Sequence, residues 1–121
     1  MTMGRFLIWR RVHLASSGGL GLAAVAHVAY TLVAFGRWSP DAVWFAGAGL
    51  GLLLLGALNY SHLGVQPCLQ PTTRLVRLAN WGFLLFGISA AWAVPEPQAY
   101  FIVLCLGGQV VASRSTLPGP A

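Results

Sequence analysis

The sequence predicts an all-α integral membrane protein: a bundle of four transmembrane helices that run up-down-up-down, with both termini in the cytoplasm. Three observations predict this fold class. Four apolar runs fill almost the whole chain of 121 residues, hydrophobic residues make up 57% of it, and charged residues make up only 7%. A soluble domain usually carries about 25% charged residues. This chain lacks the polar surface that a water-exposed fold needs, and we therefore expect one membrane domain over residues 1–121.

Each apolar run is close to the length that a membrane helix requires. The hydrocarbon core of a bilayer is about 30 Å thick, so a helix needs ~20 largely apolar residues to cross it. The expected spans cover residues 12–36, 42–64, 78–94 and 99–113. The fourth run is short, and a re-entrant or interfacial segment is its alternative interpretation.

The positive charges indicate the orientation of these spans. All seven basic residues are arginines, and only Arg37 falls in the first predicted hairpin turn. The other six precede the first span, separate the second from the third, or follow the fourth: Arg5, Arg10, Arg11, Arg74, Arg77 and Arg114. Short loops rich in Lys and Arg stay cytoplasmic. The pattern predicts a multi-pass protein of the inner, cytoplasmic membrane. A signal peptide cleaved near residues 24–26 is the alternative at the N-terminus, but the apolar run continues past this point.

The net charge of +5 does not indicate a nucleic-acid partner, because the arginines flank apolar spans and form no basic stripe. The sequence also shows no Ser/His/Asp set, since Asp41 and Glu96 are its two acidic residues and both fall in predicted outer loops. Cys68 and Cys105 do not have the spacing of a metal site. We therefore expect no catalytic residues and no metal, and we expect the lipid bilayer and other membrane proteins as partners.

Small residues at four-residue spacing predict where helices pack. Gly47 and Gly51 share one face of the second span, and Gly19 and Ala23 share a comparable face of the first. Such pairs let two helix backbones approach closely. We predict that these two faces meet; the alternative is that one of them is left open for another subunit.

Each predicted span carries one amide or hydroxyl at a similar depth from the cytoplasmic side. These residues are Ser16, Asn59, Asn80 and Gln109, with His13 and His62 just below them. Polar side chains inside a membrane must find partners or line a wet cavity. The layer therefore predicts either interhelical hydrogen bonds that set the register or a polar pocket that faces the cytoplasm.

His27 is expected deeper in the membrane, with Tyr30 one turn away. A histidine at this depth should point inward, where it bonds a neighbour, lines a ligand cavity or relays protons. Histidines in a bundle core can also hold a haem. The cofactor is otherwise unknown, and a haem or quinone redox module that uses His13, His27 or His62 is one hypothesis for the function.

Two other functional hypotheses follow from the same residues. The main hypothesis is a non-enzymatic bundle that acts through helix packing, as a homo-oligomer or as an accessory subunit of a membrane complex. The second is a carrier or binding protein for a small neutral or amphipathic molecule, which uses His27 or the polar layer. In general character the chain resembles small bacterial four-helix membrane proteins, mostly through residues 43–47 and 56–59. This resemblance transfers no functional residue.

Overall fold

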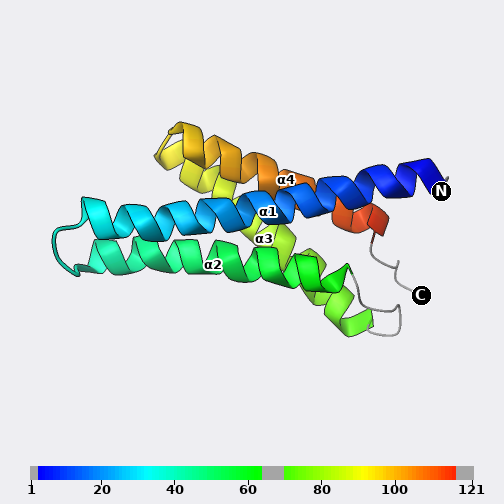
Figure 1. The fold of residues 1–121 in the computed structure, drawn as a ribbon, viewed down its shortest axis with the longest axis horizontal. Helices are drawn as coiled ribbons and strands as arrows, with labels where there is room; N and C mark the ends of the chain where they lie inside the picture. Colours follow the sequence, from blue (N-terminus) through cyan, green and yellow to red (C-terminus); the bar gives the residue numbers. More distant parts are fainter. Residues whose placement is uncertain (1–2, 64–69, 117–121) are drawn as a thin grey trace.

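Four α-helices make up the protein in its computed structural model, which describes residues 3–63 and 70–116 and contains no strand within these ranges. Consecutive helices run in opposite directions (Figure 1). The α1–α2 and α3–α4 turns, residues 35–39 and 94–96, lie at what we term the turn end. The start of α1, the end of α2, the start of α3 and the end of α4 lie at the terminal end. The helices are α1 (Met3–Ala34), α2 (Pro40–His62), α3 (Gln70–Ala93) and α4 (Pro97–Thr116).

Three of these helices are long and apolar enough to cross a membrane, over Gly4–Ala34, Pro40–His62 and Thr72–Ala93. This finding confirms the prediction of an all-α membrane bundle. Large apolar side chains lie on its outer surface, where acyl chains would contact them: Leu32 is 73% exposed and Leu104 is 74% exposed. The predicted fourth span, residues 99–113, stays a prediction. It lies within α4, whose 20 residues rise about 30 Å.

The helix ends differ from the predicted spans mainly at the terminal end. α1 and α3 begin earlier than expected, so Arg74 and Arg77 lie on α3 and not in a connecting loop. Pro71 occupies the first turn of α3, where the missing N–H removes no helical hydrogen bond. At the other end of the bundle, the Ser39 hydroxyl caps α2 by accepting a hydrogen bond of 3.3 Å from the Ala42 N–H. Cys68 lies outside the described residues.

Glycines bring two pairs of neighbouring helices, α1 with α2 and α1 with α4, close together. A Cβ atom on Gly49 of α2 would lie 2.9 Å from the His27 Cβ of α1, and one on Gly56 would lie 3.1 Å from the Ser17 carbonyl oxygen. Between α1 and α4, a Cβ on Gly19 would lie 2.6 Å from the Cys105 Sγ. A side chain at any of these positions would force the helices apart.

The contact between α1 and α2 was predicted, but different residues make it. Gly47 has open space where a Cβ would lie. A Cβ on Gly51 would lie 3.4 Å from the Phe83 ring of α3, and Gly19 faces α4. Ala23 is buried in the core. Gly49 and Gly56, and not Gly47 and Gly51, therefore make the contact with α1, because they lie on the face of α2 that points toward α1.

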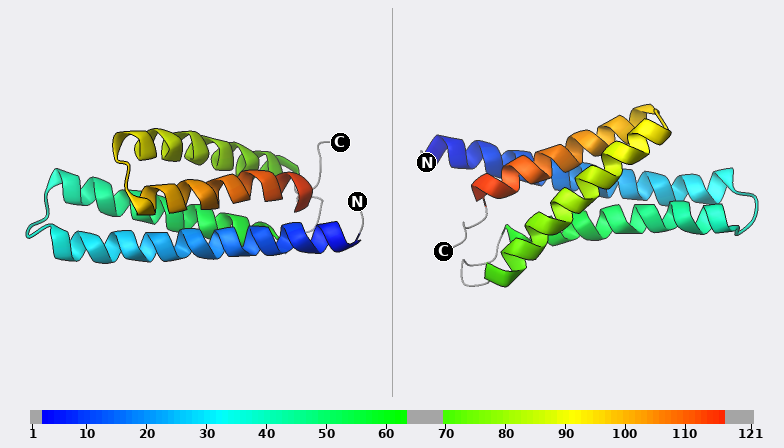
Figure 2. Two further views of the ribbon diagram at one scale, coloured as in Figure 1. Left: turned by 90° about the horizontal axis from the view of Figure 1, so that it is seen from above. Right: turned by 180° about the vertical axis from the view of Figure 1, so that it is seen from behind.

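The two hairpins cross and diverge toward the turn end (Figures 1 and 2). α1 packs along both α2 and α4, and α3 packs along α4, whereas α2 and α3, although consecutive in the chain, contact each other only sparsely. The bundle is therefore closed at the terminal end and open between α2 and α3 at the turn end.

Candidate functional site

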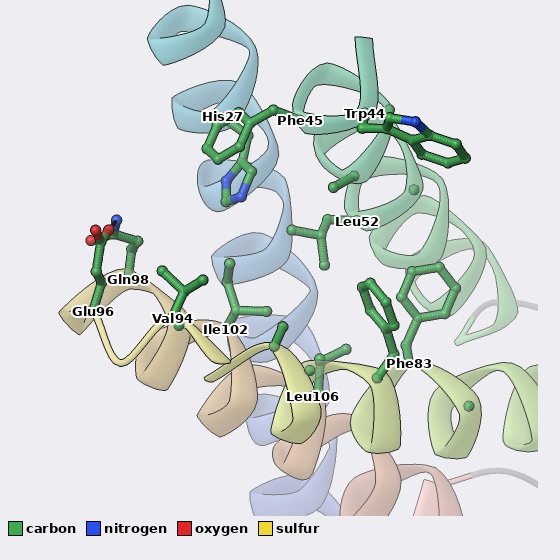
Figure 3. Close-up of a pocket in the computed structure, with 18 of the residues that line it drawn as sticks. His27, Trp44, Phe45, Leu52, Phe83, Val94, Glu96, Gln98, Ile102 and Leu106 are labelled. Atoms are coloured by element: carbon green, nitrogen blue, oxygen red, sulfur yellow. Dashed lines mark hydrogen bonds between the residues drawn. The ribbon is translucent and has the colours of Figure 1, made fainter. Parts of the chain in front are cut away.

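A cavity of about 890 Å³ lies where the two hairpins diverge. α2, α3 and α4 form most of its walls, and His27 of α1 forms another part (Figure 3). Small residues on facing sides of α2 and α3 provide the room. They are Gly47, Ala48 and Gly51 on α2 and Gly82, Gly87 and Ala90 on α3. The predicted small-residue face of α2 thus borders the cavity and not α1.

Large apolar side chains complete the lining. Phe45 and Leu52 come from α2, Phe83 and Phe86 from α3, and Ile102 from α4. Phe86 is 66% exposed, which places it at the opening toward the surrounding lipid. Flat aromatic rings and branched aliphatic chains suit a hydrophobic guest.

His27 is half-buried and is the polar residue within this apolar wall. Its Nδ1 lies 3.1 Å from the carbonyl oxygen of Ala23. A carbonyl can only accept, so Nδ1 carries the proton of the neutral ring and Nε2 keeps a lone pair. The ring stacks on Phe45 with 4.5 Å between centroids and 13° between planes. Figure 3 shows it turned toward the cavity.

The rim of the cavity at the turn end is polar. Glu96 and Gln98 lie there, at the α3–α4 turn, and the Gln98 Nε2 donates a hydrogen bond to the Glu96 carboxylate. Trp44 lines another part of the opening and is 78% exposed. The cavity therefore runs from a charged rim to an apolar interior.

Tyr30, the predicted neighbour of His27, does not line this cavity. It is 59% exposed on α1 and meets the Phe45 ring at a tilt, with 5.6 Å between centroids. Thr31 is buried instead, and its hydroxyl donates to the His27 carbonyl oxygen at 2.8 Å. His27 is thus the member of the predicted deep pair that reaches the cavity.

The predicted polar layer lies near the terminal end, apart from the cavity. Asn59 of α2 and Asn80 of α3 are fully buried and exchange two hydrogen bonds. The Asn59 Nδ2 donates to the Asn80 Oδ1 at 2.7 Å, and the Asn80 Nδ2 donates to the Asn59 Oδ1 at 2.9 Å. The His13 Nε2 of α1 lies 3.2 Å from the same Asn59 Oδ1. Three helices therefore meet at one amide.

Gln109 of α4 is also fully buried, but the serine that it contacts is not Ser16, the serine predicted to belong to the layer. Its Nε2 donates to the Ser17 Oγ at 2.7 Å and lies 3.4 Å from the His13 carbonyl oxygen. Ser16 is buried against Gly108 of α4. Ser17 was missed, although its four-residue spacing from His13 places both on one face of α1.

A second interhelical pair lies beside the amides. The His62 Nε2 of α2 is 3.1 Å from the Thr73 Oγ1 of α3. Thr73 was missed as a partner. Thr73 is seven residues from Asn80, so both lie on one face of α3. This face meets the face of α2 that carries Asn59 and His62.

The three histidines do not form one site. His27 is fourteen residues from His13 along α1, a rise of about 21 Å. The Nε2 atoms of His13 and His62 already take part in hydrogen bonds. Among the described residues there is no group of three or more His, Cys, Asp or Glu side chains that could hold a metal ion.

Comparison of the chain with known protein families, curated proteins and solved structures finds no significant match. The cavity and the buried polar contacts are therefore the features from which a function can be inferred.

Proposed function

We propose that the protein binds a small, largely apolar molecule inside the membrane, in the cavity between α2, α3 and α4. The observation that carries this proposal is the cavity itself. Its volume of about 890 Å³ lies within the range of roughly 300–1,000 Å³ that is typical of small-molecule sites. Its apolar lining with one inward-facing imidazole also matches such sites.

The arrangement of the helices supports access from the side. α2 and α3 diverge toward the turn end and contact each other only sparsely. The exposed Phe86 stands at this opening. A molecule dissolved in the acyl chains would reach the cavity between α2 and α3 without passing the buried amides at the terminal end.

We further infer the orientation in the cytoplasmic membrane of a bacterium. The helix bounds place six arginines at the terminal end and Arg37 at the turn end. Because Lys and Arg are retained on the cytoplasmic side, this distribution supports cytoplasmic termini and an outward-facing turn end. The cavity would then open in the outer leaflet.

A second candidate function follows from the glycines that border the cavity. A Cβ on Gly47 or on Gly82 would have no atom within 4 Å. A helix of a second copy, or of an accessory partner in a membrane complex, would find close approach to α2 and α3 here. A haem is favoured less, because His13 and His62 would have to break the hydrogen bonds described above.

Filling the cavity tests the main proposal. The measurement is photolabelling of the purified protein in lipid nanodiscs by 4-methoxybenzophenone, an apolar photoreactive probe, with mass-spectrometric mapping of the labelled peptides. We expect saturable labelling of peptides from α2, α3 and α4 that line the cavity. Gly47→Leu and Gly82→Leu should each reduce it by roughly tenfold or more, since a pocket discriminates even one added methylene by this amount.

The matched control is Gly18→Leu, because Gly18 also has open space around its Cβ position but lies outside the cavity. Its labelling should equal that of the wild type. Equal labelling of all three variants would refute the proposal. A loss of dimer mass in native mass spectrometry for Gly47→Leu, with labelling unchanged, would instead establish the second candidate.

A further inference from the structure

We propose that the cavity selects hydroxylated amphiphiles, a phenol or an alcohol on an apolar body, through the Nε2 atom of His27. This inference rests on the proposed binding function and names the class of ligand. Three properties of the site support it: the proton position on the ring, the fixed orientation of the ring, and the apolar surroundings.

The ring presents an acceptor to the cavity. Its Nδ1 proton is committed to the Ala23 carbonyl oxygen at 3.1 Å. The neutral imidazole has one N–H, so Nε2 has no proton to donate. A ligand must therefore bring the donor.

The orientation of the ring is held from two sides. Phe45 stacks on one face at 4.5 Å between centroids, and the Cβ of His27 lies against Gly49, where an added Cβ would come within 2.9 Å. A half-turn of the ring would break the bond to Ala23. The acceptor is thus preorganised before a ligand arrives, which lowers the entropic cost of binding.

The surroundings decide between donors. The wall around His27 is apolar and the Glu96 carboxylate lies at the rim, so a charged ammonium held against Nε2 would lose its hydration at high cost. A carboxylate, a ketone or an ether would place another lone pair against Nε2. A hydroxyl stays neutral near pH 7 and donates one hydrogen bond. The Phe45, Phe83 and Phe86 rings that line the cavity can pack against the apolar body of the ligand.

A matched pair of probes tests this selection. 4-Hydroxybenzophenone and 4-methoxybenzophenone share one photoreactive body, and the O–H of the first is replaced by O–CH₃ in the second. The measurement is the concentration of each probe that gives half-maximal labelling of the cavity peptides in nanodiscs, corrected for partition into protein-free nanodiscs. The hydroxy probe should bind roughly fivefold more tightly, the worth of one hydrogen bond.

Variants of His27 and Tyr30 test whether His27 causes the difference in affinity between the two probes. His27→Phe keeps a ring to stack on Phe45 and removes the acceptor, so the ratio of the two affinities should fall to about one. Tyr30→Phe is the control, because it removes a hydroxyl outside the cavity and should leave the ratio unchanged. A ratio of one in the wild type, or a preserved ratio in His27→Phe, would overturn the inference. The wild-type ratio remains decisive if His27→Phe does not fold.

The two proposals fail separately. If both probes label the cavity peptides equally and Gly47→Leu abolishes both, the binding function stands and the selection of hydroxyl groups is refuted. If neither probe labels the cavity peptides, or if Gly47→Leu changes nothing, the binding function itself is refuted.

Discussion

At the scale of single residues, Asn59 is the centre of the buried polar contacts. It bonds the Leu55 carbonyl oxygen on its own helix at 2.9 Å, the Asn80 amide of α3, and the His13 ring of α1. Polar side chains inside a membrane need such partners. The amide therefore specifies how α1, α2 and α3 are aligned at the terminal end.

Asn59 and Asn80 should stabilise the protein as a pair. Asn59→Leu leaves the buried Asn80 without the two hydrogen bonds described above, and we expect a loss of about 1–3 kcal/mol in the free energy of unfolding. The double variant Asn59→Leu/Asn80→Leu should be less destabilised than the sum of the singles, by about 1 kcal/mol. Reversible unfolding in mixed detergent micelles measures both. Ser61→Ala, which removes an exposed hydroxyl bonded within its own helix, is the control; a single variant as stable as this control would contradict the assignment.

At the scale of elements, α2 uses two sets of small residues for different purposes. Gly49 and Gly56 face α1, whereas Gly47 borders the cavity. Successive residues are about 100° apart around a helix, so a shift of two positions turns to nearly the opposite side. One glycine-rich helix therefore supplies both a packing face and a cavity wall.

A methyl group at Gly49 and one at Gly47 should have opposite effects on the stability of the protein. At Gly49 it would lie within 2.9 Å of His27 and 3.1 Å of the Ala24 carbonyl oxygen, so Gly49→Ala should destabilise the protein by about 1–3 kcal/mol. Gly47→Ala meets nothing and should gain up to about 1 kcal/mol from helix propensity. The same unfolding measurement checks both, and equal stabilities would show that the α1–α2 contact is looser than described.

At the scale of the whole molecule, the ends of the bundle carry the features of a membrane interface. Exposed tryptophans mark the turn end, where Trp38 is 69% and Trp92 is 90% exposed. At the terminal end the Arg114 guanidinium lies over the Trp81 ring, 5.2 Å from its centroid. Aromatic and basic side chains of this kind anchor helices at the level of the lipid headgroups.

Reporter fusions test the inferred orientation and the fourth span together. Alkaline phosphatase, which is active only outside the cytoplasm, should be inactive when fused after Arg114 and active when inserted after Arg37. Green fluorescent protein should fluoresce at the first position and not, after Sec export, at the second. An active phosphatase after Arg114 would mean that α4 does not cross, and would favour the re-entrant interpretation of residues 99–113.

The pattern of residues along the chain was enough to predict apolar helices of membrane-spanning length, because a backbone in lipid must satisfy its own hydrogen bonds. It also placed Asn59, Asn80 and Gln109 near one depth, since depth follows from counting residues along a helix. The contacts of the folded chain were needed to show that Gln109 meets Ser17 and not Ser16, and that Gly49 and not Gly47 faces α1. Rotation about a helix axis and the crossing of two hairpins depend on contacts between distant residues. The cavity and the role of His27 in its wall depend on the same crossing.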